Sequence, residues 1–360
     1  MVYMSDPSYI LLFGAGASKP MLPTAAEMTD KLVSEITKDP DDELKRALSF
    51  ILGGIHFLRG CEGEFPHQDI NIEHVAMTLD ALCSRQRHEL SPFVGSWNEL
   101  LQRFEGSNGK RRHCFEDLRC YLRDAVVRWL KTPPIGDIDH LGRLKDLRSR
   151  FGAPVEVFTL NYDLCVERAL EDREMRFTTG FTPLGWSADE FAKPEHDVRL
   201  YKLHGSLAWY RDEDNGVIYS RLRPPEDRVS MSDVPPLIIF GIVHKMQPVD
   251  PFLYLSYTFS EKVKVCKVIG VVGYGFGDDY INRILGQGLA HDSRKRLVVV
   301  DRDADWAMQI MRERFSDAPA LIDAGRVSFL DGGVVDALKT KSLCNQIAQL
   351  IDEASDSGPF

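Results

Sequence analysis

The sequence has few cysteines and none in the spacing of a metal module. Its seven cysteines include no CxxC pair. Structural zinc sites usually take their ligands in close pairs, and an odd number of cysteines cannot form a complete disulfide framework. We therefore expect reduced thiols, no zinc and no other metal.

Long apolar runs and basic surface are also lacking. No stretch reaches the ~18 uninterrupted apolar residues that predict a membrane-spanning helix. The N-terminal segment has neither the basic region nor the small-residue cleavage site of a signal peptide. With 44 Lys and Arg against 54 Asp and Glu, the net charge is −10. This balance argues against non-specific binding to nucleic acid or to an anionic membrane.

Two common nucleotide loops are absent as well. The sequence has no GxxxxGK[ST] loop, which disfavours a P-loop ATPase. The GAGAS segment at 14–18 is not a complete GxGxxG motif, because Lys19 stands where the third glycine belongs.

Short apolar runs alternate with helical patterns along the chain. Such runs, ended by glycine or polar residues, are typical of buried parallel strands. The predicted strands are 9–13, 155–160, 198–203, 268–272, 297–300 and 327–330. Helical patterns fill 43–58, 72–85, 93–104, 115–130 and 141–150, almost without strand signal. Further helices are expected at 164–170, 280–289, 304–315 and 335–351, and a hairpin at 209–220.

The alternation predicts an α/β fold. We expect a Rossmann-like, mostly parallel sheet with helices on both faces, plus an inserted all-helical subdomain. The nucleotide-binding domain would comprise 1–39 and 151–354, the helical insert 40–150 and a frayed tail 355–360.

Polar and glycine residues follow five of the predicted strands, where ligands bind in open parallel sheets. The loop 14–18 precedes a helix expected from Thr24, so its backbone could hold a phosphate, or it could be only a tight turn. Asn161 and Asp163 could read a ribose or a carboxamide, or form an Asx turn and helix cap. His204 could move a proton near neutral pH or be a structural histidine. The segment Gly273–Gly275, Asp279 and Asp301 could hold ribose hydroxyls or serve as turns and caps.

In this order, GAGAS, TLNYD (159–163), KLHGS (202–206), VVGYGFGDD (271–279) and VVVD (298–301) resemble the motifs of the sirtuin family, in particular its bacterial defence branch. Protein-deacylating sirtuins bear a four-cysteine zinc module, which is absent here. The resemblance therefore implies hydrolysis of NAD+ at the nicotinamide–ribose bond, with NAD+ as the substrate.

The resemblance also assigns roles. The catalytic residues would be Asn161 for the ribose or water, Asp163 for the carboxamide and positive charge, and His204 as the base. The residues implied to bind the dinucleotide are Gly14, Ala15, Gly16, Ala17, Ser18, Thr24, Thr159, Gly273, Tyr274, Gly275, Asp279 and Asp301.

The alternatives are an NAD+-dependent deacylase or ADP-ribosyltransferase, and a non-catalytic sensor of NAD+ or ADP-ribose. Because a free NAD+ hydrolase would be toxic, we expect control by a partner. Chains of this kind resemble the sirtuin component of two-gene systems with a HerA-type hexameric ATPase, in cytoplasmic bacterial defence against phage. A short Argonaute-like protein is the second choice of partner, and a homo-oligomer is also expected.

Overall fold

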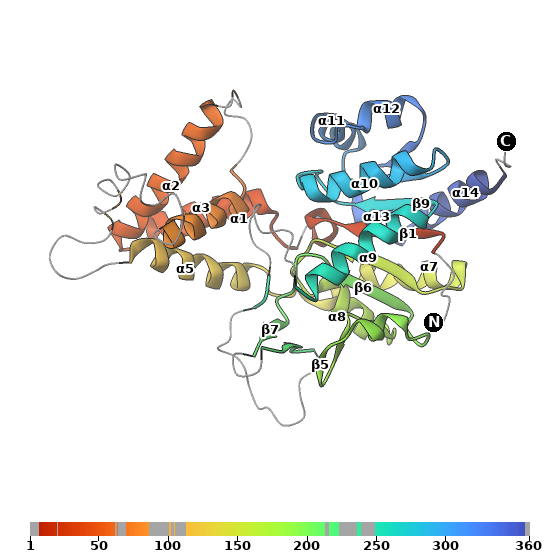
Figure 1. Ribbon diagram of the computed structural model, residues 1–360, viewed down its shortest axis with the longest axis horizontal. Helices are drawn as coiled ribbons and strands as arrows, with labels where there is room; N and C mark the ends of the chain where they lie inside the picture. The colour runs from red at the N-terminus through yellow and green to blue at the C-terminus, as the bar shows by residue number, and fades with distance from the viewer. Residues whose placement is uncertain are drawn as a thin grey trace. The chain divides into compact units, whose positions relative to one another are not determined.

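The fold comes from a computed structural model of the 360-residue chain, shown in Figure 1. The structure describes residues 7–19, 21–61, 63, 70–85, 101, 104, 113–212, 216–222, 236–238 and 249–356. The chain divides into two compact units. We call Met1–Leu22, Thr132–Ile239 and Met246–Phe360 the sheet unit, and Pro23–Lys131 with Phe240–Lys245 the helical unit.

A seven-stranded sheet forms the centre of the sheet unit. Its order is β11-β10-β9-β1-β2-β6-β3, and every neighbouring pair is parallel. The strands are β1 (Tyr9–Phe13), β2 (Val155–Thr159), β3 (Phe177–Thr178), β6 (Val198–Lys202), β9 (Val268–Val272), β10 (Arg296–Val300) and β11 (Val327–Leu330). All residues of β1, β2, β6 and β9 are buried. Continuous apolar runs predict this for β1 and β9, whereas β2 and β6 also bury Glu156, Arg199 and Lys202.

Two antiparallel hairpins lie outside this sheet. β7 (Trp209–Arg211) pairs with β8 (Ile218–Ser220), which confirms the hairpin expected at 209–220. β4 (Phe181–Thr182) pairs with β5 (Gly185–Trp186), and their two-residue strands carry too little pattern to be predicted. Outside these strands, Ile238 forms an isolated antiparallel bridge with Gly205.

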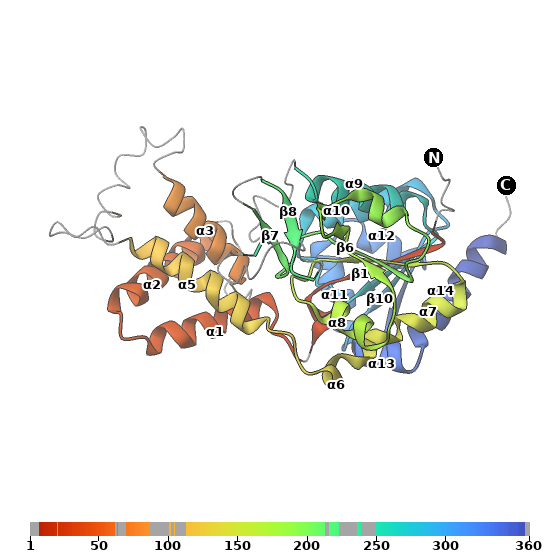
Figure 2. The ribbon, with the colours of Figure 1, turned by 90° about the horizontal axis from the view of Figure 1, so that it is seen from below.

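Helices cover both faces of the sheet, as Figure 2 shows for α9, α10 and α12 on one side and α7, α8, α13 and α14 on the other. On the first side, Ile10 and Leu12 of β1 join a core that includes Leu255 of α9 and Leu285 of α10. On the second, a Cβ at Gly270 would meet Leu11 at 2.7 Å and Ile347 of α14 at 3.6 Å. The helices of this unit are α6 (Ile135–Ile138), α7 (Leu144–Phe151), α8 (Cys165–Asp172), α9 (Phe252–Val265), α10 (Asp279–His291), α11 (Ala304–Arg314), α12 (Ala318–Asp323), α13 (Gly333–Lys339) and α14 (Ser342–Asp356), with short 3-10 turns η1 (Ala15–Ser18), η4 (Asp139–Arg143) and η5 (Ala188–Ala192). The predicted fold class, a parallel α/β sheet with an additional helical part, is confirmed.

The helical unit packs α1 (Ala25–Lys38), α2 (Asp42–Cys61), α3 (Ile72–Ser84) and α5 (Cys114–Trp129) against one another. Thr24 and Glu27 form a reciprocal capping box that starts α1. Glu35 of α1 accepts hydrogen bonds from Trp129 Nε1 at 2.7 Å, Tyr121 Oη at 2.9 Å and Arg128 Nη2 at 2.9 Å. Partial burial raises the pKa of Glu35, but these three donors outweigh it, so the pKa is below its usual value.

The unit boundaries differ from the predicted ranges. We expected the first helix in the nucleotide-binding domain, but α1 packs on α2, α3 and α5 within the helical unit. Conversely, α6, η4 and α7 belong to the sheet unit, where α7 packs on β2 and α14. Periodicity shows that a segment is helical but not which helices its apolar side packs against.

Other helices also differ from prediction. The helix expected at 335–351 is two helices, α13 and α14, separated at Lys341, which has a left-handed φ of 63°. Most of the helix expected at 93–104 lies outside the described residues, as do 357–360 of the predicted tail, whereas α14 extends to Asp356. Among the described residues, no helix is both long and apolar enough to cross a membrane.

Candidate functional site

The carboxyl ends of β1, β2, β6 and β9 lie side by side in the sheet. β1 is the point where the strand order reverses, because β2 and β6 follow on one side and β9 and β10 on the other. Ligands in open parallel sheets bind at this kind of position. The loops after these four strands contain most of the predicted site residues.

The loops after β1 and β9 are joined through their backbones. Gly14 N–H donates to Val272 O at 3.0 Å, and Gly16 N–H donates to Gly273 O at 2.8 Å. A Cβ at Gly14 would lie 2.6 Å from Gly273 O, and one at Gly16 would lie 2.6 Å from Gly273 Cα. Gly273 itself has a φ of 61°, and a Cβ there would meet Ala17 N at 2.4 Å. These glycines are therefore required by the contact between the two loops, and their predicted phosphate-binding role remains a prediction.

The loop after β1 is not followed by a long helix within the same unit, as a strand–loop–helix motif would require. Residues Ala15–Ser18 form a single 3-10 turn, and the helix that begins after Thr24 belongs to the helical unit. The expected long helix directly behind the loop is therefore not part of the sheet unit. Gly-rich spacing predicts the turn but does not specify where the next helix packs.

Three predicted residues from two distant loops are linked by hydrogen bonds. Ser18 Oγ donates to Asp163 Oδ2 at 2.9 Å, and Asn161 Nδ2 donates to Ser18 Oγ at 3.1 Å. Asp163 and Ser18 are buried, whereas Asn161 is half-buried. Ser18 thus fixes the amide of Asn161, and Asp163 fixes Ser18.

Each oxygen of the Asp163 carboxylate accepts a hydrogen bond from the protein. Besides Ser18, the carboxylate accepts from the backbone N–H of Cys165 at 2.9 Å, two positions further on, which forms an Asx turn just before α8. Burial, and then the Asp163 carboxylate, raise the pKa of the Cys165 thiol far above its usual value, so Cys165 is protonated. For Asp163 the Asx-turn alternative is realised, in combination with the contact to Ser18.

His204 follows β6 and lies beside Asp278. His204 Nε2 is 3.3 Å from Asp278 Oδ2, and both side chains are almost fully buried. The ring of Tyr162, which stands between Asn161 and Asp163, is 6.4 Å from the His204 ring, centroid to centroid. Tyr162 therefore connects the loop after β2 with the histidine after β6.

The loop after β9 is pinned by its own side chains. The Tyr274 hydroxyl lies 3.0 Å from Asn282 Oδ1 and accepts from Asp278 N–H at 3.1 Å. Asn282 Nδ2 donates to Phe276 O at 2.9 Å. Asp278 Oδ1 caps α10 by accepting from the backbone N–H groups of Tyr280 and Ile281. The loop thereby holds the carboxylate that faces His204.

Several predicted residues lie elsewhere or have other contacts. Asp279 is an exposed residue in the first turn of α10, and its neighbour Asp278 contacts His204 instead. Asp301 accepts from Arg302 N–H at 2.7 Å, which is the local-turn alternative. Thr159 Oγ1 accepts from Asn161 N–H at 3.1 Å, and Thr24 caps α1 in the helical unit. Gly275 is half-buried, and a Cβ there would have only Arg314 Nη1 near it, at 4.0 Å.

Sequence reasoning missed Asp278, Asn282 and the pair of Lys202 with Glu167. Asp278 shares the motif with Asp279, and its position directly before a helix is the signal for a cap. Asn282 and Glu167 lie inside helical patterns that give no signal of contact with the site. Groups of three or more histidine, cysteine or acidic residues suited to a metal do not occur among the described residues.

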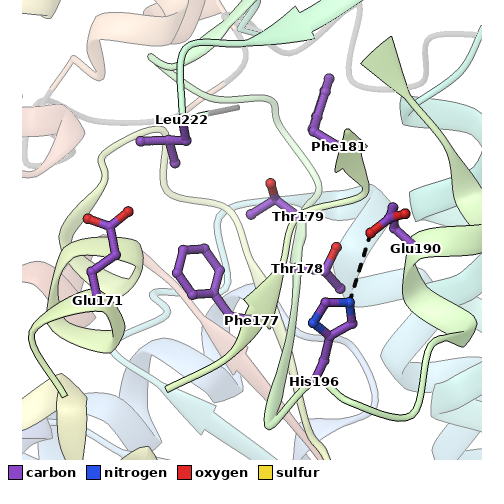
Figure 3. Close-up of a pocket in the computed structure, with 8 residues that line it drawn as sticks. All are labelled: Glu171, Phe177, Thr178, Thr179, Phe181, Glu190, His196 and Leu222. Carbon is purple, nitrogen blue, oxygen red and sulfur yellow. Dashed lines mark ion pairs between the residues drawn. The ribbon is translucent and has the colours of Figure 1, made fainter. Parts of the chain in front are cut away.

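A small cavity of about 50 Å³ lies at the β3 edge of the sheet (Figure 3). Its acidic, hydroxyl and aromatic lining comes from Glu171, Phe177, Thr178, Thr179, Phe181, Glu190, His196 and Leu222. His196 Nε2 is 3.9 Å from Glu190 Oε2, the ion pair drawn in the close-up. None of the residues predicted to bind or cleave a dinucleotide lines this cavity, so it is separate from the strand-end site.

One protein-family model matches part of the chain. Residues 155–321, from β2 to α12, match the family model of the SIR2-like domain. The match includes Asn161, Asp163, His204 and the loop after β9. No curated protein is similar enough to the chain to count as a match.

Solved structures of Sir2 proteins also align with the chain. One, described as the structural basis for the mechanism and regulation of Sir2 enzymes, has 14% identity and a TM-score of 0.38, covering 98% of this chain and 95% of that chain. A Sir2 homolog–NAD complex has 12% identity and a TM-score of 0.44, with 96% and 91% covered. Sir2 bound to acetylated peptide has 11% identity and a TM-score of 0.42, with 95% of each chain covered.

Proposed function

We propose that this protein is an NAD+ glycohydrolase that cleaves NAD+ to nicotinamide and ADP-ribose. The observation that carries the proposal is the hydrogen-bonded chain from Asn161 through Ser18 to Asp163, with His204 on the adjacent strand end. The match of this segment to the SIR2-like domain supports the same substrate class.

The reaction needs few groups. Departure of nicotinamide breaks the bond to the ribose C1′ and develops oxocarbenium character there, and water then forms the new C1′–O bond while releasing a proton. In the proposed mechanism Asn161 orients the ribose or the attacking water, and His204 accepts the proton. General-base assistance of this kind contributes typically ~10²–10⁴-fold.

The contacts of Asp163 change its proposed role. Both carboxylate oxygens accept hydrogen bonds from the protein, one from Ser18 and one from Cys165 N–H. We therefore assign Asp163 to holding Ser18, and through it Asn161, in place of direct contact with the carboxamide. We assign Asp278 to stabilising the imidazolium that forms when His204 accepts the proton, since its carboxylate lies 3.3 Å from Nε2.

The test is to incubate the purified protein with NAD+ and measure nicotinamide and ADP-ribose. We expect Asn161→Ala and His204→Ala to remove turnover while the thermal unfolding profile remains cooperative. His291→Ala, at an exposed histidine at the end of α10, is the matched control and retains turnover. Full turnover by both site variants contradicts the assignment.

Product analysis distinguishes the alternatives. Nicotinamide release only when an acyl-lysine peptide or another acceptor protein is added supports a deacylase or ADP-ribosyltransferase. Binding of NAD+ or ADP-ribose with no release, both alone and with a HerA-type partner added, supports a sensor.

We further propose that the activity serves antiphage defence by NAD+ depletion under the control of a HerA-type ATPase. The resemblance of the motif order to the bacterial defence branch supports this role. Co-expression with a HerA-type protein encoded beside it, followed by gel filtration and the NAD+ assay, tests it. Separate elution of the two proteins with unchanged turnover contradicts control by that partner.

A further inference from the structure

A buried ion pair lies directly beneath the proposed site. Lys202, the last residue of β6, places Nζ 2.9 Å from Glu167 Oε1 of α8, and each side chain is only 1% exposed. Lys202 stands two positions before His204 on the same chain segment. The pair therefore links the strand that carries the histidine with the helix that follows the Asn161–Asp163 loop.

Lys202 has a second acceptor within this loop. Its Nζ donates to the main-chain carbonyl of Asp163 at 2.5 Å. Asp163 holds Ser18, and Ser18 holds Asn161. A single ammonium group is thus hydrogen-bonded to the residue from which the orientation of Asn161 derives.

Stability alone gives a weak reason for such a pair. Removing two charges from water costs several kcal/mol per ion, and apolar residues of similar volume often stabilise a fold as well or better. Burial raises the pKa of Glu167 more than Lys202 lowers it. Glu167 Oε2 is buried and has no hydrogen-bond partner among the described residues. The pair is therefore incompletely satisfied as a structural element, but it supplies a strong donor to Asp163 O.

We infer that Lys202 is a positioning residue for the reaction at Asn161, with Glu167 as its counter-charge. This inference rests on the proposed function for its catalytic consequence. Without the ammonium group, the carbonyl of Asp163 loses a charged donor, the loop after β2 gains freedom, and Asn161 is no longer held in one orientation. Substrate binding depends on other loops, so turnover falls while the KM for NAD+ changes little.

A matched pair of double variants tests the inference. Lys202→Met with Glu167→Gln removes both charges together and so leaves no uncompensated buried ion. Arg199→Met with Glu156→Gln is the control, since Arg199 Nη1 of β6 and Glu156 Oε1 of the neighbouring strand β2 also form a buried pair, at 2.8 Å. The bonds of Arg199 that the structure shows end at Glu156 and Lys193 O.

We expect the Lys202 and Glu167 variant to lose ~10-fold or more in kcat, with KM within ~2-fold of wild type. The control variant keeps kcat at any comparable loss of thermal stability. If both double variants have the same kcat, whether that of wild type or a lower one, the inference is overturned. Should the first double variant not fold, Lys202→Arg takes its place, because it retains the charge but displaces the donor from Asp163 O. An unchanged kcat in Lys202→Arg then overturns the inference.

A second readout does not require turnover. The side-chain amide signals of Asn161 are assigned by NMR through their loss in Asn161→Ala, and their hydrogen exchange is measured. We expect exchange to rise ~10-fold or more in the Lys202 and Glu167 variant, or in Lys202→Arg, and to stay unchanged in the control. Unchanged exchange overturns the positioning role. If the wild-type protein releases no nicotinamide, the proposed function fails, and this exchange experiment still decides whether Lys202 positions Asn161.

Discussion

Ser18 donates a hydrogen bond to Asp163 at 2.9 Å, although 145 positions separate the two residues in the sequence. The contact joins the loop after β1 to the loop after β2, between which the chain passes through the helical unit. It is the structural basis for treating these two loops as one site.

Ser18→Ala is expected to reduce both stability and turnover. It leaves a buried carboxylate oxygen of Asp163 without its donor, which costs about 1–3 kcal/mol in the free energy of unfolding. It also removes the acceptor of Asn161 Nδ2. Chemical denaturation and NAD+ turnover measure the two effects.

Asn161→Ala is the matched comparison. Asn161 is half-buried, and its removal leaves no buried charge without a partner, so this variant should lose turnover with a smaller loss of stability than Ser18→Ala. If Asn161→Ala is less stable than Ser18→Ala, this account of the Ser18–Asp163 contact is contradicted.

Asp278 permits its two roles to be separated. Asp278→Asn retains an N-cap side chain for α10 but removes the charge that lies 3.3 Å from His204. We expect thermal stability close to wild type with a fall in kcat. Asp278→Ala removes the cap as well and should cost about 1 kcal/mol more in the free energy of unfolding. Equal stability of the two variants, measured by denaturant titration, contradicts the capping role.

The glycines of the loop after β9 should respond differently to alanine. Gly273→Ala places a Cβ 2.4 Å from Ala17 N at a φ of 61°, so we expect a severe loss of folded protein. Gly275→Ala meets only Arg314 Nη1 at 4.0 Å and should fold with near wild-type stability. Soluble yield and thermal unfolding of the two variants provide the comparison. A stable Gly273→Ala protein is incompatible with the backbone contact between the loops.

Glu35 should make the helical unit sensitive to acid. Its pKa is lower in the folded state than its ordinary value, so its carboxylate contributes stability at neutral pH. That contribution is lost as the pH falls through the folded-state pKa, because the donors Trp129, Tyr121 and Arg128 then face a protonated group.

Glu35→Gln should therefore lower the melting temperature at pH 7, and the difference from wild type should shrink towards pH 3. Circular dichroism melts of the full chain at both pH values measure this. Glu353→Gln, at an exposed glutamate near the end of α14, is a control in the sheet unit. If the difference between Glu35→Gln and wild type grows at low pH, the carboxylate does not stabilise the helical unit in this way.

Two central strands of the sheet could be predicted because burial on both faces leaves a continuous apolar run. YILLF at 9–13 and VIGVV at 268–272 coincide with β1 and β9. The edge strand β3 has only two residues and was not predicted, since such a segment is defined by pairing with β6 and not by its own pattern. Likewise, helix α1 was predicted as a helix but assigned to the other unit.

The candidate site shows the same division. Strand-end positions indicated Ser18, Asn161, Asp163 and His204, and the structure joins the first three directly. The choice between Asp278 and Asp279 depends on which carboxylate points towards β6, and adjacent acidic residues carry no such signal. The bond from Lys202 to Asp163 O arises from tertiary packing, because a lysine inside an apolar strand gives no indication of its partner.

The central position of β1 has a consequence for biosynthesis. Its two neighbours, β2 and β9, begin at Val155 and Val268. During translation the segment YILLF therefore leaves the ribosome long before either partner strand is synthesised. Residues close to it in the sequence do not supply the strands with which it pairs. An apolar β-forming segment that waits unpaired is prone to aggregation. Recovery of soluble protein should therefore depend on chaperone capacity and on expression temperature more than on the stability of the finished sheet.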